Sequence, residues 1–262
     1  MTERGEKASS PAVTRAVQIL DYLANSKAEA GVTEIASALD INKSTCFNIL
    51  RALADEAIVI KDARFPIYRL GPRLVELGTA SRRNFSQLRQ IMDLIRPLVE
   101  DIGVTCIIAQ PIPGDRGFVV IDRVVPRGAD VLTVPIGHSY PLTSPAMGRA
   151  FLAARDLDEV ISSVHNRPDV SEAAILNLAA SLDRVREAGY GWSDEEYQHQ
   201  TNAVAVAVTG EDRSVVVILC LVGHVDRFGR ERIDDYGRAL VAVGREVEMI
   251  VQHNRRAITT VS

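Results

Sequence analysis

The chain has 262 residues, with 30 lysines and arginines against 34 aspartates and glutamates, which gives a formal net charge of −4. Hydrophobic residues make up 47% and charged residues 24%, as in an average globular protein, so the composition excludes a disordered or collagen-like chain. No apolar run approaches the ~18 residues of a membrane-spanning helix, and the polar N-terminus holds no apolar signal region. We therefore expect a cytoplasmic protein of one large domain or two modest ones.

The cysteines and histidines indicate neither a disulfide framework nor a metal site. Cys46, Cys106 and Cys220 are widely spaced in apolar surroundings, and no C-x-x-C pair occurs. The five histidines are scattered, without a second ligand at helical spacing. We expect three buried core thiols, no bound metal and no cofactor.

Charge is distributed unevenly along the chain. Residues 1–85 carry 12 lysines and arginines against 10 acidic residues, whereas the remaining residues carry 18 against 24. Such asymmetry is a mild indication that the N-terminal part meets nucleic acid.

The N-terminal residues predict a polar tail followed by two helices. Residues 1–10 are expected to form a disordered tail, and residues 13–26 a first helix. A short second helix is predicted for residues 33–39, with Thr33 as its N-cap, and residues 40–42 end it. The apolar residues of the first helix lie largely on one stripe: Val13, Val17, Ile19, Leu20 and Leu23.

A third helix and a ribbon complete the first domain. In residues 43–57 the apolar positions follow the spacing i, i+3, i+4, i+7, which predicts a helix with one buried face made of Cys46, Ile49, Leu50 and Leu53. Residues 58–71 alternate around an Asp-Ala-Arg turn, a pattern that predicts a two-stranded ribbon. Three helices and a ribbon predict a winged helix-turn-helix domain over residues 11–71.

The rest of the chain combines helical and strand patterns. Residues 72–86 predict a linker helix that Pro72 starts, and Pro97 lies inside or between turns of the next helix. Helical patterns recur later in the chain, and the short loop 209–213 favours an antiparallel strand pair. An α+β domain is therefore predicted over residues 87–255. Its predicted strands are residues 104–112, 117–125, 203–208 and 214–223, and its later helices are residues 171–189 and 231–256.

The third helix would be the one that reads DNA, because the second helix of a helix-turn-helix motif lies in the major groove. Basic side chains there can neutralise phosphates, hydroxyls can donate to phosphate or base acceptors, and asparagine can pair bidentately with adenine. A wing arginine can reach a phosphate or the narrow minor groove. The expected DNA-binding residues are Thr33, Lys43, Ser44, Thr45, Asn48, Arg51 and, at the wing tip, Arg64.

A winged helix that binds only proteins is an alternative, since any solvated helix face carries polar residues. The weak positive charge of the N-terminal part also argues against DNA, because each phosphate contact contributes through counterion release. A symmetric dimer would double the phosphate contacts and the bases read. We therefore expect double-stranded DNA with a near-palindromic site as the partner, bound by an even-numbered oligomer.

The segment GHSYP at residues 137–141 falls one residue short of the G-x-S-x-G elbow of hydrolases. A serine hydrolase is thus another alternative, with a catalytic pair drawn from Ser139 and one of His138, His165 and His199. That elbow needs a helix immediately after the serine, yet Pro141 replaces the final glycine and the helical pattern starts only at residue 145. We expect Ser139 to be a turn residue and the chain not to be an enzyme.

The helix that follows offers a different kind of site. Ser144 and Pro145 are its expected N-cap and first-turn residues. The backbone N–H groups of Ala146 and Met147 then lack helical acceptors, and the helix dipole favours a carboxylate beside them. An ordinary capped helix with only water at its end is the simpler alternative.

Six segments form a pattern that covers most of the chain. They are RAVQILDYLA, VTEIASALDINKSTCFNILRALADEAIVIKD and YRLGPRLVELG in the N-terminal part, and PIGHSYPLTSPAMGRAFLA, REAGYGWSDEEY and LCLVGHVDRF in the C-terminal part. Their order and spacing, from residue 13 to residue 251, resemble the IclR family of bacterial transcriptional regulators. The resemblance implies a regulator, with repression favoured over activation, that forms dimers or dimers of dimers. It also implies a GAF-like effector-binding domain with a curved antiparallel sheet flanked by helices.

Two departures from the family pattern concern the DNA-reading helix and one strand. Asn48 stands where an arginine is common, so the resemblance does not carry over a base preference. Residues 199–208 lack the usual glycine and the Ala-Pro pair that follows it, so the resemblance does not fix the strand geometry there.

The resemblance also implies an effector pocket in the C-terminal domain. Cys220 and Val222 stand where family members can have serine, so the pocket should be more apolar than one built for a two-carbon oxoacid. An aromatic or medium-sized aliphatic acid is the expected effector. The implied contacts are Leu132, Tyr140, Ala146, Met147, Ser193, Thr201, Ala203, Cys220 and Val222.

Three further residues are candidates beside this pocket. Trp192 is a candidate for one wall, with a place in the core as the simpler alternative. Glu195 and Glu196 are candidates to contact a donor group of the effector, although paired acids beside a loop are usually solvated.

Overall fold

A computed structural model describes residues 10–25, 29–83, 87–128, 132–165 and 170–259. The contacts divide the chain into two compact units, residues 1–85 and 86–262. The tail expected at residues 1–10 lies outside the described residues, apart from Ser10. Among the described helices, none is both long and apolar enough to cross a membrane.

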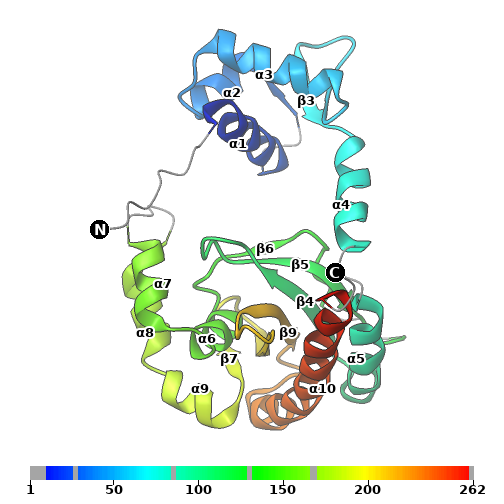
Figure 1. Ribbon diagram of the computed structural model, residues 1–262, viewed down its shortest axis with the longest axis vertical. Helices are drawn as coiled ribbons and strands as arrows, with labels where there is room; N and C mark the ends of the chain where they lie inside the picture. Colours follow the sequence, from blue (N-terminus) through cyan, green and yellow to red (C-terminus); the bar gives the residue numbers. More distant parts are fainter. Residues whose placement is uncertain (1–9, 26–28, 84–86, 129–131, 166–169, 260–262) are drawn as a thin grey trace. The chain divides into compact units, whose positions relative to one another are not determined.

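The first unit combines three helices with a small antiparallel sheet (Figure 1). The helices are α1 (Pro11–Asn25), α2 (Val32–Ala38) and α3 (Lys43–Asp55), and the strands are β1 (Ala30–Gly31), β2 (Val59–Lys61) and β3 (Ile67–Leu70). The sheet order is β1-β3-β2, so the predicted ribbon forms the wing. The winged helix-turn-helix is therefore confirmed. Strand β1 was not predicted, because two residues are too short to show an alternating pattern.

The core of this unit holds only part of the apolar stripe predicted for α1. Ile19 and Leu23 are buried, together with Leu50 of α3, whereas Val13 is 63% and Val17 46% exposed. At about 100° per residue, Val17 lies about 120° or more around the helix from Ile19 and Leu23. The prediction that Val13 and Val17 share the buried stripe is therefore wrong.

The helix starts show which residues cap them. Thr33 is not an N-cap: α2 begins at Val32 and Gly31 occupies the cap position, because β1 pairs with β3 up to that residue. At the start of α3, the side chain of Asn42 accepts hydrogen bonds from the backbone N–H and the hydroxyl of Ser44, at 2.9 and 2.7 Å. Asparagine directly before a helix is a strong cap signal, so the sequence contained this information.

Helix α4 (Arg73–Arg83) follows the wing directly, after Pro72, and corresponds to most of the predicted linker helix. Residues 84–86, the end of that prediction, lie outside the described residues. A Cβ on Gly71 would lie 2.1 Å from the carbonyl oxygen of Ala57, so the end of the wing packs backbone to backbone against the turn after α3.

The second unit is built on a six-stranded antiparallel sheet with the order β6-β5-β4-β9-β8-β7. Its strands are β4 (Thr105–Pro111), β5 (Phe118–Val124), β6 (Ser139–Tyr140), β7 (Gly191–Asp194), β8 (Thr201–Thr209) and β9 (Val215–His224). The antiparallel β8–β9 pair is as predicted. Strands β6 and β7 were not predicted, again because they are short.

Helices lie on both faces of this sheet (Figure 1). They are α5 (Leu88–Ile102), α6 (Pro145–Ala153), α7 (Leu157–Val164), α8 (Glu172–Ala179), α9 (Leu182–Ala188) and α10 (Ile233–Thr259), with a 3₁₀ turn, η1 (Arg230–Arg232), before the last. Helices α5 and α10 pack on one face, and α6 packs on the other. The predicted helix 171–189 is two helices, α8 and α9, and Pro97 lies inside α5.

Both faces of the central strands are buried, which explains their continuous apolar runs. On β4, Ile107 and Ala109 belong to the core shared with α6 and α8. Cys220 and Val222 of β9 belong to the same core. This face of the sheet therefore supplies the floor beneath the start of α6.

Leu50→Ala should destabilise the first unit far more than Val17→Ala. Leu50 is fully buried in α3, so truncation leaves a cavity and is expected to cost about 2–5 kcal/mol. Val17 is 46% exposed, so its truncation should cost about 0.5 kcal/mol or less. Urea unfolding followed by circular dichroism measures both values. Equal losses for the two variants would contradict this assignment of the core.

Candidate functional site

A cavity of about 190 Å³ lies beside the start of α6. Its floor comes from β4, β8 and β9, and its walls come from α6, from residues 132–140 and from the loop between β7 and β8. All nine residues expected from the sequence to contact an effector line this one cavity: Leu132, Tyr140, Ala146, Met147, Ser193, Thr201, Ala203, Cys220 and Val222. They come from segments up to ninety residues apart, which the fold of the sheet brings together.

Eight more residues line the cavity and were not expected: Ile107, Thr133, Val134, Pro135, His138, Ser144, Tyr197 and Gln198. Ile107 lies beside Cys220 because β4 pairs with β9 in that register, a pairing that the sequence did not predict. The other positions depend on how two irregular segments fold back, which the sequence pattern does not specify.

The floor of the cavity is apolar. Ile107 and Val222 are buried, and Ala203 is half-buried with only a methyl group as its side chain. Burial raises the pKa of the Cys220 thiol, and the nearby Cys106 raises it further, so the thiol stays neutral. A bound molecule would therefore place its hydrocarbon part over this floor.

Two buried serines line the cavity, and their hydroxyls have no hydrogen-bond partner among the described residues. Ser144 is 4% and Ser193 3% exposed, and within the described residues neither hydroxyl makes a hydrogen bond. Buried hydroxyls normally have a hydrogen-bond partner, so each of these marks a place where a ligand or water can bond. Ser193 lies on β7 and Ser144 directly before α6, so they approach the cavity from different elements.

The start of α6 adds backbone donors to these hydroxyls. Ser144 occupies the expected N-cap position and Pro145 the first helical position, but the Ser144 side chain makes no capping hydrogen bond. Helix geometry leaves the N–H groups of Ala146 and Met147 without acceptors in the helix, at its positive end. Both residues line the cavity, so this end of α6 can hold a carboxylate.

Three aromatic rings form a row along one wall. The Tyr140 ring lies 4.7 Å from His138 and 5.3 Å from Tyr197, measured between centroids. Burial raises the pKa of Tyr140, so its hydroxyl remains a neutral donor. Tyr197 is 46% exposed, which places it at the outer side of the row.

The geometry around Ser139 does not support a hydrolase. Ser139 is an exposed residue of strand β6, paired with Val119, and not the turn residue that the sequence predicts. In the described part of the chain, no hydrogen bond joins its hydroxyl to a histidine. His199 instead contacts Glu195 at 3.0 Å, and His165 contacts Glu172 at 3.5 Å.

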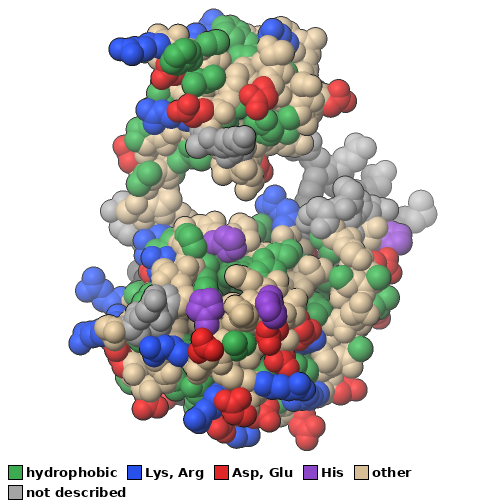
Figure 2. Space-filling view, turned by 180° about the vertical axis from the view of Figure 1, so that it is seen from behind, with side chains coloured by type: hydrophobic (Ala, Val, Ile, Leu, Met, Phe, Trp, Pro, Cys, Tyr) green, Lys and Arg blue, Asp and Glu red, His purple; other side chains and the backbone are tan. Residues whose placement is uncertain are grey.

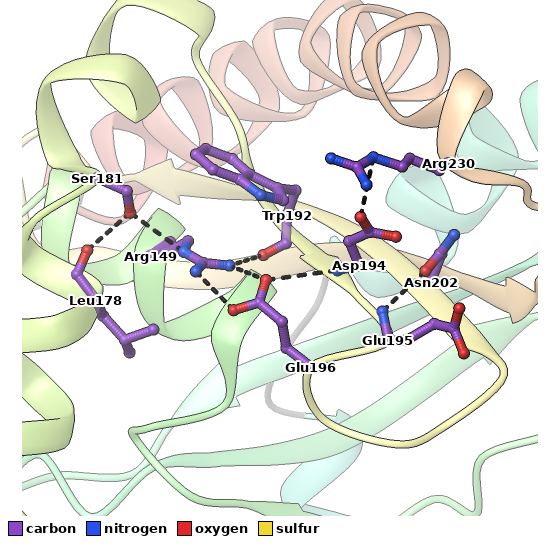
Figure 3. A network of polar contacts seen from close by, with 9 residues as sticks. All are labelled: Arg149, Leu178, Ser181, Trp192, Asp194, Glu195, Glu196, Asn202 and Arg230. Atoms are coloured by element: carbon purple, nitrogen blue, oxygen red, sulfur yellow. Dashed lines mark hydrogen bonds and ion pairs between the residues drawn. The ribbon is translucent and has the colours of Figure 1, made fainter.

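The three further candidates near the pocket lie outside it. Trp192 is half-buried and does not line the cavity, so the wall position for which it was a candidate is not where it lies. Glu196 forms an ion pair with Arg149 of α6, at 2.7 Å, and is therefore not a freely solvated acid (Figure 3). Glu195 contacts His199 and accepts a hydrogen bond from the backbone N–H of Gln200.

The expected DNA-binding residues lie on the surface of the first unit. Lys43, Ser44, Asn48 and Arg51 are exposed along α3, Thr45 is half-buried, Thr33 is exposed on α2, and Arg64 is exposed at the wing turn. The Ser44 hydroxyl donates to Asn42, so in this arrangement it can offer a ligand only its acceptor capacity. On the face of the first unit that Figure 2 shows, acidic and basic side chains are mixed.

Two exposed aromatic residues beside this set were missed. Phe47 of α3 is 43% exposed and Phe65 of the wing turn is 62% exposed. The turn itself is fixed by Asp62, whose side chain accepts from the N–H groups of Arg64 and Phe65. These two bonds lower the pKa of Asp62, and the charge of Arg69 does so more weakly. An aromatic residue off the apolar stripe of α3 was the signal that could have identified Phe47.

Two family profiles match the chain. One, described as "IclR helix-turn-helix domain", matches residues 12–63, and the other, "Bacterial transcriptional regulator IclR C-terminal", matches residues 93–249. The acetate operon repressor of Salmonella typhimurium is 24% identical over 242 residues, which cover 90% of this chain and 88% of that protein. The transcriptional regulator KdgR of Escherichia coli is 28% identical over 251 residues, covering 91% and 92%.

A solved structure is also similar over almost the whole chain. The IclR transcriptional regulator from Alicyclobacillus acidocaldarius superposes with a TM-score of 0.77 at 26% identity, covering 92% of this chain and 98% of that one. The relatives are transcriptional regulators and repressors, in agreement with the expectation that the chain is not an enzyme. The chain belongs to the IclR family of bacterial transcriptional regulators.

Proposed function

We propose that the chain is a transcriptional repressor whose DNA binding is modulated by a small organic acid. Residues 11–71 would bind the operator, residues 72–86 would link the domains, and residues 87–255 would bind the acid. One observation supports an acid as the ligand. Ser144 and Ser193, whose hydroxyls have no partner among the described residues, line the same cavity as the start of α6, above an apolar floor.

We favour repression over activation because similar proteins are named repressors. The acetate operon repressor and the repressor IclR of Escherichia coli, 23% identical over 261 residues, are both named repressors. A repressor of this kind binds its operator in one state and releases it, or holds it more tightly, when the acid shifts the equilibrium. Such coupling typically amounts to about 1–3 kcal/mol, and DNA must change the acid's affinity by the same factor.

The proposed operator contacts are of two kinds: contacts to phosphates, which position the protein, and contacts to base edges, which read the sequence. Lys43 and Arg51 would neutralise phosphates, and Arg64 would enter or flank the minor groove. Asn48 would pair with adenine, and the exposed Phe47 ring would contact a thymine methyl group. One unit offers few cations, so we propose a homodimer, or a dimer of dimers, on a near-palindromic site.

The size and lining of the cavity limit the acid. An apolar cavity of roughly 150 Å³ holds benzene, so 190 Å³ suits one ring with a carboxylate or an aliphatic acid of similar size. The carboxylate would accept from Ser144, Ser193 and the N–H groups of Ala146 and Met147. The hydrocarbon part would lie over Cys220 and its neighbours on the floor.

Arg51→Ala and Asn48→Ala should weaken operator binding in different ways. Loss of Arg51 removes a phosphate contact, so affinity should fall on all sequences and the slope of log K against log salt should decrease by about one. Loss of Asn48 should cost about 1–3 kcal/mol on the preferred site only. Footprinting of the DNA upstream of the chain's own gene supplies the site, and anisotropy titrations at several salt concentrations measure both effects. No protected site, with or without a panel of small acids, would overturn the repressor proposal.

Phe47 should make binding sensitive to one thymine methyl group in each half-site. Replacing that thymine by uracil removes only the methyl group, so it should weaken the wild-type protein and leave Phe47→Ala unaffected. Phe65→Ala, at the wing turn, is the matched control and should keep the sensitivity. Equal sensitivity in all three proteins would show that Phe47 does not contact the thymine methyl group.

An acid that occupies the cavity should stabilise the protein in a thermal-shift screen of aromatic and aliphatic acids. At a hundredfold its Kd the expected stabilisation is about 2.7 kcal/mol. Met147→Trp should abolish the effect, because the larger ring would fill the cavity, whereas Met249→Trp on the 56% exposed position of α10 should not. An acid that stabilises Met147→Trp as strongly as the wild type binds elsewhere.

A further inference from the structure

Arg149 of α6 is a buried arginine whose three guanidinium nitrogens all donate hydrogen bonds (Figure 3). The residue is 9% exposed. Its Nη1 and Nη2 atoms donate to the two carboxylate oxygens of Glu196, each at 2.7 Å. Nη1 also donates to the carbonyl oxygen of Trp192, and Nε donates to the hydroxyl of Ser181 at 3.2 Å. Such a bidentate pair is among the strongest side-chain interactions in proteins and has a fixed geometry.

The partner, Glu196, belongs to a segment that closes one side of the cavity. This segment is the cavity loop, residues 195–200. It joins β7 to β8 and contributes Tyr197 and Gln198 to the cavity lining. Glu195 and Gln200, at its ends, have left-handed backbone angles, with φ of 56° and 61°. Both residues are non-glycine, so this conformation must be held by surrounding contacts.

The ends of the cavity loop are tied to the rest of the unit by separate contacts. The N–H of Glu195 donates to the side chain of Asn202 at 3.0 Å, and Asn202 in turn donates to the carbonyl oxygen of Phe228. Asp194, just before the loop, contacts Arg230 at 3.2 Å (Figure 3). Within the loop, the side chain of Glu196 bonds to Arg149 of α6, the helix that forms another wall of the cavity.

The two partners of the ion pair differ in how easily they can leave it. The side chain of Arg149 is 11% exposed, and without Glu196 it keeps its bonds to Trp192 and Ser181. The side chain of Glu196 is 37% exposed, so water can solvate its carboxylate once the pair opens. Opening should therefore move the cavity loop and leave α6 in place.

We propose that the Arg149–Glu196 pair is a latch that holds the cavity loop against α6 and so fixes two walls of the cavity at a set separation. Arg149 and Glu196 are positioning residues: neither lines the cavity, yet α6 carries the backbone donors and the loop carries Tyr197 and Gln198. The part of this inference that concerns ligand affinity rests on the proposed acid-binding function. The part that concerns the loop does not.

The latch is tested by hydrogen exchange on the full-length protein without added ligand. Glu196→Gln removes the negative charge of the pair, and Arg149→Lys removes the two-pronged guanidinium geometry. Each should speed hydrogen exchange of the amides of residues 195–201 by about tenfold or more, which corresponds roughly to the free energy of one charge-assisted hydrogen bond. Asp115→Asn is the matched control, since Asp115 is also a buried partner of an arginine, Arg155, at 3.3 Å, but it does not line the cavity. It should leave exchange in the cavity loop unchanged.

Three exchange outcomes decide the proposal. Faster exchange confined to residues 195–201 in both latch variants, with Tm near that of the wild type, supports it. Unchanged loop exchange in Glu196→Gln overturns it. Faster exchange that extends over α6 also overturns it, because the pair would then support the fold as a whole instead of positioning the loop.

Benzoate serves as the probe for the effect of the latch on ligand affinity. If wild-type protein binds benzoate by calorimetry, Glu196→Gln should weaken binding about tenfold while Asp115→Asn keeps it. Equal affinities in all three proteins would show that the latch does not position the cavity walls. Failure of the wild type to bind any acid of the thermal-shift panel would count against the proposed function alone, and the exchange result would still decide the latch.

Discussion

The arrangement of the second unit depends on the close contact between α6 and β7, where only glycine fits at position 191. A Cβ on Gly191 would lie 2.3 Å from the carbonyl oxygen of Ala146 and 2.7 Å from the nitrogen of Ala150. On another side of α6, a Cβ on Gly148 would lie 2.4 Å from the carbonyl oxygen of Leu142. Backbone contact at two places fixes the helix on the sheet, with its first turn at the cavity and Arg149 within reach of Trp192.

This fixed helix gives the cavity an unusual electrostatic character. Of the described residues that line it, none is lysine or arginine and His138 is the one basic side chain, so attraction for an anion would come largely from partial charges on the first turn of α6 and from neutral hydroxyls. Such groups hold an acid without a full opposite charge, and desolvation opposes them less than it would a buried cation.

Long periodic segments allowed the sequence to predict most elements, and short or irregular segments did not. The three helices and ribbon of the first unit were predicted from their apolar spacing, whereas β1, β6 and β7 have too few residues to show a period. The nine cavity residues were expected from family resemblance, which carries spatial information that spacing lacks. The Arg149–Glu196 pair joins positions 47 residues apart, and nothing in either local pattern indicates the other.

Trp192 is the chain's only tryptophan, and two neighbouring arginines make its fluorescence sensitive to the structure around it. The guanidinium groups of Arg149 and Arg184 both lie over its ring, 4.8 and 4.2 Å from the centroid. The emission energy of an excited indole shifts with nearby charge, so a change in either arginine's position alters its fluorescence. The DNA-binding unit contributes no tryptophan signal of its own. The native protein therefore carries a single tryptophan reporter beside Arg149, one that can be followed without a label while the protein is bound to its operator.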